Sequence, residues 1–161
     1  MTIAVPKAEI HCHIEGAASP DLVRRQAGKY GVDVSSFIDD AGYVWSDFTT
    51  FLAAYDGAAA LFRTEEDYAL LAETYLSGIA AEGAIYAEIF VSPDHAERSG
   101  IGTSGYLAGL GAGIERARLA SGIECRMIVV GIRHFGPDAV EATARLAADR
   151  PHALITGFGM A

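Results

Sequence analysis

The sequence predicts an α/β fold, in which parallel strands alternate with the helices that cover them. Four short segments are apolar and rich in β-branched residues, as strands are: 7–14, 84–92, 125–133 and 153–160. Five longer segments have helical character: 20–30, 47–62, 65–81, 103–121 and 137–148. Strands that alternate with helices of this length pair in parallel through right-handed crossovers, which defines the α/β class.

The helix boundaries carry signals of their own. Ser19, Asp47 and Thr64 each precede a predicted helix, where their side chains can accept hydrogen bonds from its first N–H groups. Gly31 and Gly122 follow helices, at the position where a left-handed residue ends a helix. We find no internal repeat, low-complexity tract or linker in the sequence, so we predict one domain.

The alternation fits either a (β/α)8 barrel or an open sheet. A complete eight-stranded barrel takes about 250 residues, whereas this sequence has 161 residues and four predicted strands. The sequence ends at residue 161, just after the predicted strand 153–160, and no helix follows to cover that strand. We therefore expect residues 1–161 to form the first half of a (β/α)8 TIM-type barrel, with four βα units and inserted helices, truncated after strand 4.

The composition is typical of a globular protein. Hydrophobic residues make up 51% of the chain, and its formal net charge of -9 disfavours association with nucleic acid or anionic membranes. The first ten residues include Lys7 and Glu9 without an apolar run, and no apolar stretch approaches the roughly 20 residues of a membrane helix. We expect a cytoplasmic protein in which Cys12 and Cys125 are free and buried.

The first predicted strand is polar on one face. Alternation places Glu9, His11, His13 and Glu15 on that face, with apolar residues between them on the other. A parallel strand is ordinarily buried on both faces, so these polar groups need a partner, and two imidazoles at this spacing can share one zinc ion. An edge strand with its polar face in water is the alternative. The position at the carboxyl end of the strand, where barrel enzymes have their active sites, favours the metal.

Four segments together resemble one enzyme family, the adenosine deaminases. Residues 6–16 (PKAEIHCHIEG) resemble its opening, a proline and a basic residue followed by E-L-H-x-H-L-[D/E]-G. Residues 51–56 (FLAAYD) resemble its F-L-x-x-[F/Y]-D helix, and residues 86–93 (YAEIFVSP) resemble its second strand, Y-x-E-[I/L]-R-[F/Y]-x-P. Residues 157–161 (GFGMA) resemble the beginning of G-x-D-L-A-G-x-E. The resemblance covers nearly the whole chain in family order.

The resemblance implies a barrel that holds one zinc ion and hydrolytically removes the 6-amino group of adenosine or a related purine nucleoside or base. His11 and His13 match the two zinc ligands of the first strand, and Glu15 matches the acid that contacts the nucleoside sugar. Phe51 and Tyr55 match the helix face that covers the pocket. His13, Glu15, Phe51 and Tyr55 are therefore the expected substrate-binding residues.

The remaining catalytic groups of the family follow position 161. These are a third zinc ligand and a proton-transfer glutamate in an H-A-G-E segment, a later histidine and a late pair of aspartates. We therefore assign no catalytic residue within this chain, and we expect it to hold zinc weakly and to be inactive alone. Phe90, where many members have arginine, and Gly159, where aspartate is usual, indicate a subfamily with a different substrate. Glu15 in place of aspartate shifts the expected sugar contact by about 1 Å.

Several other patterns have a structural interpretation. The GxGxxG run at 100–105 does not directly follow a strand, as a dinucleotide site requires. His95 begins an H-x-E like that of the cytosine-type zinc deaminases, but P-C-x-x-C is missing, so we interpret it as a polar loop residue. His134 and His152 are interpreted as loop histidines, and Glu88 as a core hydrogen-bonding group or an acid that orients a histidine.

Three functions remain open from the sequence. The first is a purine deaminase, the second another metal-dependent hydrolase with an HxH strand, acting on cyclic amides or phosphate esters, and the third a non-catalytic half-barrel module. The apolar helix face at Phe51 and Tyr55 favours the first, because it suits a flat purine. A half-barrel also exposes the outer edges of its first and fourth strands, so we expect it to self-associate.

Overall fold

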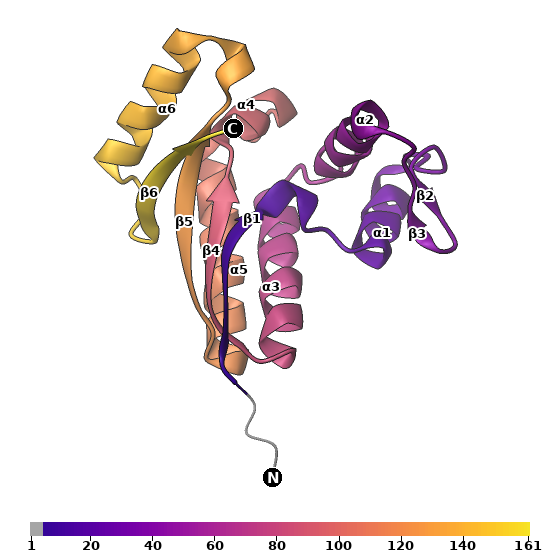
Figure 1. Cartoon of the computed structure of the whole chain (residues 1–161), viewed down its shortest axis with the longest axis horizontal. Helices are drawn as coiled ribbons and strands as arrows, with labels where there is room; N and C mark the ends of the chain where they lie inside the picture. Colours follow the sequence, from indigo (N-terminus) through magenta and orange to yellow (C-terminus); the bar gives the residue numbers. More distant parts are fainter. Residues whose placement is uncertain (1–4) are drawn as a thin grey trace.

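The computed structural model describes residues 5–161, apart from the side chain of Arg98. Of the first ten residues, which the sequence analysis tested for a leader peptide, residues 1–4 lie outside the described range. Its centre is a four-stranded parallel sheet in the order β1-β4-β5-β6 (Figure 1). The strands are β1 (Lys7–His13), β4 (Ala84–Val91), β5 (Glu124–Gly131) and β6 (Ile155–Met160). The α/β prediction is confirmed, and all four predicted strands are present.

The helices also follow the prediction closely. They are α1 (Pro20–Tyr30), α2 (Phe48–Ala59), α3 (Glu65–Ala81), α4 (Pro93–Ser99), α5 (Gly102–Ser121) and α6 (Pro137–Asp149), with short 3-10 turns η1 (Ile14–Gly16) and η2 (Arg133–Phe135). Ser19, Asp47 and Thr64 cap their helices through their side chains, as expected. Sequence analysis missed α4, which is short and lacks an apolar period, and the hairpin of β2 (Ile38–Asp39) and β3 (Gly42–Tyr43).

Three local predictions are wrong in detail. Strand β1 ends at His13 and the chain turns into η1, so Glu15 does not continue the polar face of the strand. His95 lies within α4 and not in a loop. Cys125 is buried and Cys12 is only half-buried, although both are free. Among the described residues, no helix has the length and apolar character needed to cross a membrane.

Helices α3 and α5 pack closely beside one another on one face of the sheet (Figure 1). A Cβ atom at Gly109 would lie 2.4 Å from the carbonyl oxygen of Glu65, and one at Gly113 would lie 2.2 Å from that of Ala69. Only glycine therefore allows the two backbones to approach this closely. The glycines at 100 and 102 have positive φ and form the turn between α4 and α5, which explains the GxGxxG run without a nucleotide.

The two faces of the sheet have different surroundings. The face toward α3 and α5 forms the core, and its central side chains are fully buried: Ala87, Ile89, Val91, Met127 and Val129. Apolar side chains of the two edge strands are open instead, since Ile10 is 64% exposed, Met160 61% and Phe158 39%. The helix layer therefore supplies most of the buried apolar area, while the edges keep unpaired backbone groups next to apolar surface.

Residues 17–64 form a lobe beyond the carboxyl end of β1, with α1, the hairpin and α2 (Figure 1). Asp67, in the first turn of α3, fastens this lobe to the sheet domain. Its carboxylate is 2% exposed and accepts hydrogen bonds from Gln26 at 2.7 Å, Lys29 at 2.6 Å and the hydroxyl of Tyr30, all on α1. The backbone N–H groups of residues 63 and 64 donate to it as well, each at 3.1 Å. One buried carboxylate therefore connects three segments.

We expect Asp67→Asn to destabilise the chain by about 2 kcal/mol at pH 7. The amide has one acceptor oxygen in place of two, so some of the groups that donate to the buried carboxylate would lose their acceptor. Burial alone would raise the pKa of Asp67, but its hydrogen bonds with Lys29, Tyr30 and Gln26 outweigh burial and hold that pKa below its usual range. The stabilisation is present above the unfolded pKa of about 4 and is lost as the pH falls toward the folded pKa. Urea unfolding at several pH values measures this difference.

The matched control is Asp21→Asn, which removes an exposed carboxylate of α1 paired only with Arg24. We expect its free energy of unfolding to stay within about 0.5 kcal/mol of that of the parent chain. Equal effects of the two substitutions, or an Asp67→Asn effect that does not shrink below pH 4, would contradict the assigned role.

We expect the 161-residue chain to self-associate, because unpaired edge strands beside exposed apolar side chains act as a template for association. Charge repulsion from the net charge of -9 opposes this but is screened beyond about 8 Å at physiological salt. Light scattering after size exclusion at two salt concentrations measures the mass. Ile10→Lys and Met160→Lys should reduce association, whereas Leu119→Lys, at a 73% exposed position of α5, should not. A 17.0 kDa monomer at both salt concentrations would refute the expectation.

Candidate active site

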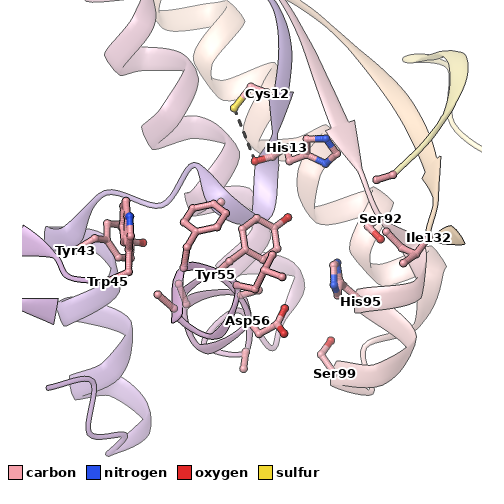
Figure 2. Close-up of a pocket in the computed structure, with 18 of the residues that line it drawn as sticks. Cys12, His13, Tyr43, Trp45, Tyr55, Asp56, Ser92, His95, Ser99 and Ile132 are labelled. Carbon is pink, nitrogen blue, oxygen red and sulfur yellow. Dashed lines mark hydrogen bonds between the residues drawn. The ribbon is translucent and has the colours of Figure 1, made fainter. Parts of the chain in front are cut away.

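A cavity of about 1200 Å³ lies at the carboxyl ends of β1, β4 and β5, and the lobe covers one side of it (Figure 2). Its lining includes the predicted residues His11, His13, Phe51 and Tyr55. It also includes residues that were not predicted, among them Trp45, Ser92 and His95. The carboxyl ends of parallel strands are where active sites of this architecture collect.

His11 and His13 lie on the same face of β1, and the centroids of their rings are 5.6 Å apart. Two imidazoles that bind one zinc ion at about 2.0 Å have ring centroids roughly 5 Å apart. Burial lowers the pKa of His13, and the nearby Glu15 only partly opposes this, so the neutral ring that can bind a metal is favoured. The donor set and its spacing thus fit two positions in the coordination shell of zinc.

The aromatic ring of Phe90, on β4, lies next to the two imidazole rings. It stacks on His11 with centroids 4.2 Å apart and lies 5.3 Å from His13. Phe90 contributes no donor atom, but its ring packs against both imidazoles. Within the described part of the chain, no group of three His, Cys, Asp or Glu side chains lies close enough to hold a metal. A catalytic zinc site usually has three protein ligands, so this chain supplies two of them at most.

Glu15 is buried to 1% exposure beside the two histidines, in η1. Its Oε2 accepts a hydrogen bond from the hydroxyl of Tyr55 at 3.2 Å, and its Oε1 accepts from the hydroxyl of Tyr106 and from the N–H of Ser92 at 3.2 Å. Burial and the charge of Glu15 raise the pKa of both tyrosines, which stay protonated donors. The carboxylate is therefore committed to this protein's own groups.

Helix α2 carries Phe51 and Tyr55 four residues apart, hence on one face, and both line the cavity. Tyr55 lies over Gly16, where a Cβ atom would come within 2.6 Å of its ring. Phe51 packs edge-on against Trp45, with ring centroids 5.3 Å apart. The structure thus places the two predicted lid residues over the cavity and adds Trp45 to the aromatic group.

Other candidate residues fall into two groups. His134 lies at the rim of the cavity and is exposed, while His152 is elsewhere, against Gly111 of α5. Glu88 does not line the cavity and accepts a hydrogen bond from Tyr86 at 2.9 Å, in line with a structural role. Sequence analysis missed Ser92 and His95 as cavity residues, because the three-residue spacing that aligns them becomes a signal only once α4 is known to be a helix.

Comparison with known proteins identifies the family. A model of the family described as adenosine deaminase matches residues 6–161. The chain belongs to the adenosine deaminase family. Its relatives include an adenine deaminase of Chelativorans sp. (strain BNC1), 66% identical over 155 residues that are 96% of this chain and 48% of that protein. An adenine deaminase of Rhizobium meliloti (strain 1021) is 59% identical over all 161 residues, 50% of its own length.

Solved structures of the family have the same fold. An adenine deaminase from Arthrobacter aurescens superposes with a TM-score of 0.80 at 26% identity, over 97% of this chain and 48% of that one. An amidohydrolase from Burkholderia ambifaria, with bound Zn, gives a TM-score of 0.82 at 26% identity, over 98% of this chain and 44% of that one. The chain spans about half the length of the curated relatives it matches. The fold is the first half of a TIM-type barrel of this family, as predicted.

We expect the isolated chain to bind zinc weakly, because His11 and His13 provide only two ligands. Isothermal titration calorimetry with zinc measures the affinity. His11→Ala and His13→Ala should each remove the remaining binding, whereas His152→Ala, which changes a histidine outside the cavity, should leave it unchanged. Tight stoichiometric binding that survives His11→Ala would show that the metal is held by other residues.

Proposed function

We propose that this chain is the amino-terminal part of a zinc-dependent adenine deaminase, which hydrolytically replaces the 6-amino group of a free purine base. The observation that carries the proposal is the buried carboxylate of Glu15 beside His11 and His13. Three donors already occupy this carboxylate, so a sugar hydroxyl can reach it only by displacing Tyr55 or Tyr106. A free base has no sugar hydroxyl, so it can bind without displacing either tyrosine. The names of the relatives at 66% and 59% identity support the same substrate.

The residues of this chain have distinct parts in the proposed reaction. His11 and His13 would hold the zinc ion together with ligands from outside residues 1–161, and the ion would supply a water activated at neutral pH. Phe51 and Tyr55 would cover the flat base and exclude bulk water. Glu15 would fix Tyr55 in that position through its hydrogen bond. Proton transfer to the ring is assigned to residues beyond this chain.

The features of the cavity do not favour a phosphate ester as the substrate. Arg63 is the one guanidinium among its described lining residues. Its Nε donates to the carbonyl oxygen of Ala60 at 3.0 Å, and its guanidinium lies 4.4 Å from the ring centroid of Tyr30. No described lysine or arginine of the lining is therefore free to bind a phosphate near His11 and His13, whereas aromatic rings suited to a purine surround the space.

The proposal predicts the activity of a fusion enzyme. Residues 1–161 are joined to the carboxyl-terminal half of the Chelativorans relative, and conversion of adenine to hypoxanthine is followed by ultraviolet absorbance. We expect turnover of adenine with kcat/KM at least about a hundredfold above that for adenosine, because the unavailable Glu15 leaves the sugar hydroxyls without a partner. Chelation should abolish the activity and zinc should restore it.

Three controls accompany the fusion. The 161-residue chain alone should be inactive, and His11→Ala should inactivate the fusion, whereas His152→Ala should not. A fusion that prefers adenosine to adenine would contradict the assigned substrate. An active His11→Ala fusion would contradict the assigned metal site.

A further inference from the structure

One segment at the end of β4 holds three buried polar atoms that have no partner within the protein. They are Ser92 Oγ, Asp94 Oδ2 and His95 Nδ1, and no other buried side-chain nitrogen or oxygen of the described residues lacks a hydrogen bond. A buried polar atom without a partner costs about 1–3 kcal/mol, so native structures contain few of them. Three within four residues indicate that this segment binds a group other than its own neighbours.

The backbone of this segment is held firmly in place. The N–H of Ser92 donates to Tyr106 Oη at 2.9 Å and to Glu15 Oε1 at 3.2 Å, and Ser92 is 2% exposed. Ser92 is also the residue that precedes α4, where a serine side chain ordinarily accepts a hydrogen bond from the helix. Here its hydroxyl makes no such bond. A fixed residue whose hydroxyl is not used by the fold is available for a ligand.

His95 follows Ser92 by three residues, so both side chains lie on one face of the first turn of α4. Both line the cavity that also contains His11 and His13. The ring of His95 faces Tyr55, with centroids 6.1 Å apart, and Figure 2 shows it in the cavity opposite α2. Asp94 does not line the cavity, so it has no part in the proposal.

We propose that Ser92 and His95 bind the N3–N9 edge of the purine base and thereby select a free base over a nucleoside. This inference rests on the proposed function. Carbon 6 has to lie at His11 and His13 to react, so another contact in the cavity meets a different part of the purine. N3 and N9 form the polar edge farthest from carbon 6. In the free base this edge offers one acceptor, N3, and one donor, N9–H, and a hydroxyl with a neutral imidazole complements both.

The same edge distinguishes the base from the nucleoside. A nucleoside carries its sugar on N9 and therefore has no N9–H to donate. Its binding would leave His95 Nδ1 unpaired and would bring the sugar against Ser92 and the occupied Glu15. A site that hydrogen-bonds one group of its substrate rejects analogues without that group strongly, because its own buried atoms then stay unpaired. The pair can thus determine specificity without taking part in the chemical step.

Substrate analogues test the two contacts separately in the fusion enzyme. 9-Methyladenine lacks N9–H, and 3-deazaadenine lacks the N3 acceptor. We expect Ser92→Ala and His95→Ala each to raise KM for adenine about tenfold with little change in kcat, as the loss of one buried hydrogen bond predicts. In His95→Ala the discrimination between adenine and 9-methyladenine should disappear. In Ser92→Ala the discrimination between adenine and 3-deazaadenine should disappear.

Two further variants serve as controls. His95→Asn should recover most of the affinity, because the amide can hydrogen-bond near the position of Nδ1. His152→Ala changes a histidine outside the cavity and should leave KM unchanged. Variants that lower thermal stability and kcat while keeping the full discrimination against both analogues would overturn the inference. In that case Ser92 and His95 contact the rest of the protein and not the substrate.

A separate measurement on the 161-residue chain distinguishes failure of this inference from failure of the proposed function. A fusion without adenine deaminase activity contradicts the function. NMR of the five histidine side chains of the chain, titrated with adenine, then tests the site itself. A shift of the His95 signal with adenine but not with 9-methyladenine supports the inference, and an unchanged His95 signal overturns it.

Discussion

The carboxylate of Glu15 is the group on which the geometry of the cavity depends. It lies two residues after His13, at 1% exposure, and accepts hydrogen bonds from α2, from α5 and from the end of β4. Removing one partner of a buried, hydrogen-bonded charge leaves it uncompensated, which costs far more than the bond itself contributes. The relative positions of the histidine strand, the aromatic lid and the Ser92 segment are therefore coupled through one side chain.

That coupling explains why a residue typical of a substrate contact can have a structural role here. A carboxylate open to the cavity would be free to accept a sugar hydroxyl. Tyr55 and Tyr106 instead cover it, and their raised pKa values keep both phenols protonated as donors. Tyr55 has little room to turn away, because its ring lies against Gly16. The charge of Glu15 thus contributes to the shape of the cavity.

The sequence predicted the strands, most helices and the histidine pair, because each leaves a local signal of periodicity, capping or motif. It did not predict the orientation of Glu15, since alternation along β1 stops when the chain turns into η1 at Ile14. It also missed Asp67 and Tyr106, whose roles depend on partners at separations of 38 and 91 residues along the chain. Only the packed fold brings such groups together, so no local sequence pattern predicts these hydrogen bonds.

Stability and chemistry are divided between the two faces of the sheet. Gly109 and Gly113 let α5 approach α3 closely, and the helix-facing residues of β4 and β5 are fully buried, so this layer packs like the core of a complete domain. His11 and Phe90 lie on the other face, where their rings stack. The helix layer can therefore hold the histidine pair and the Ser92 segment in position from the face opposite the cavity.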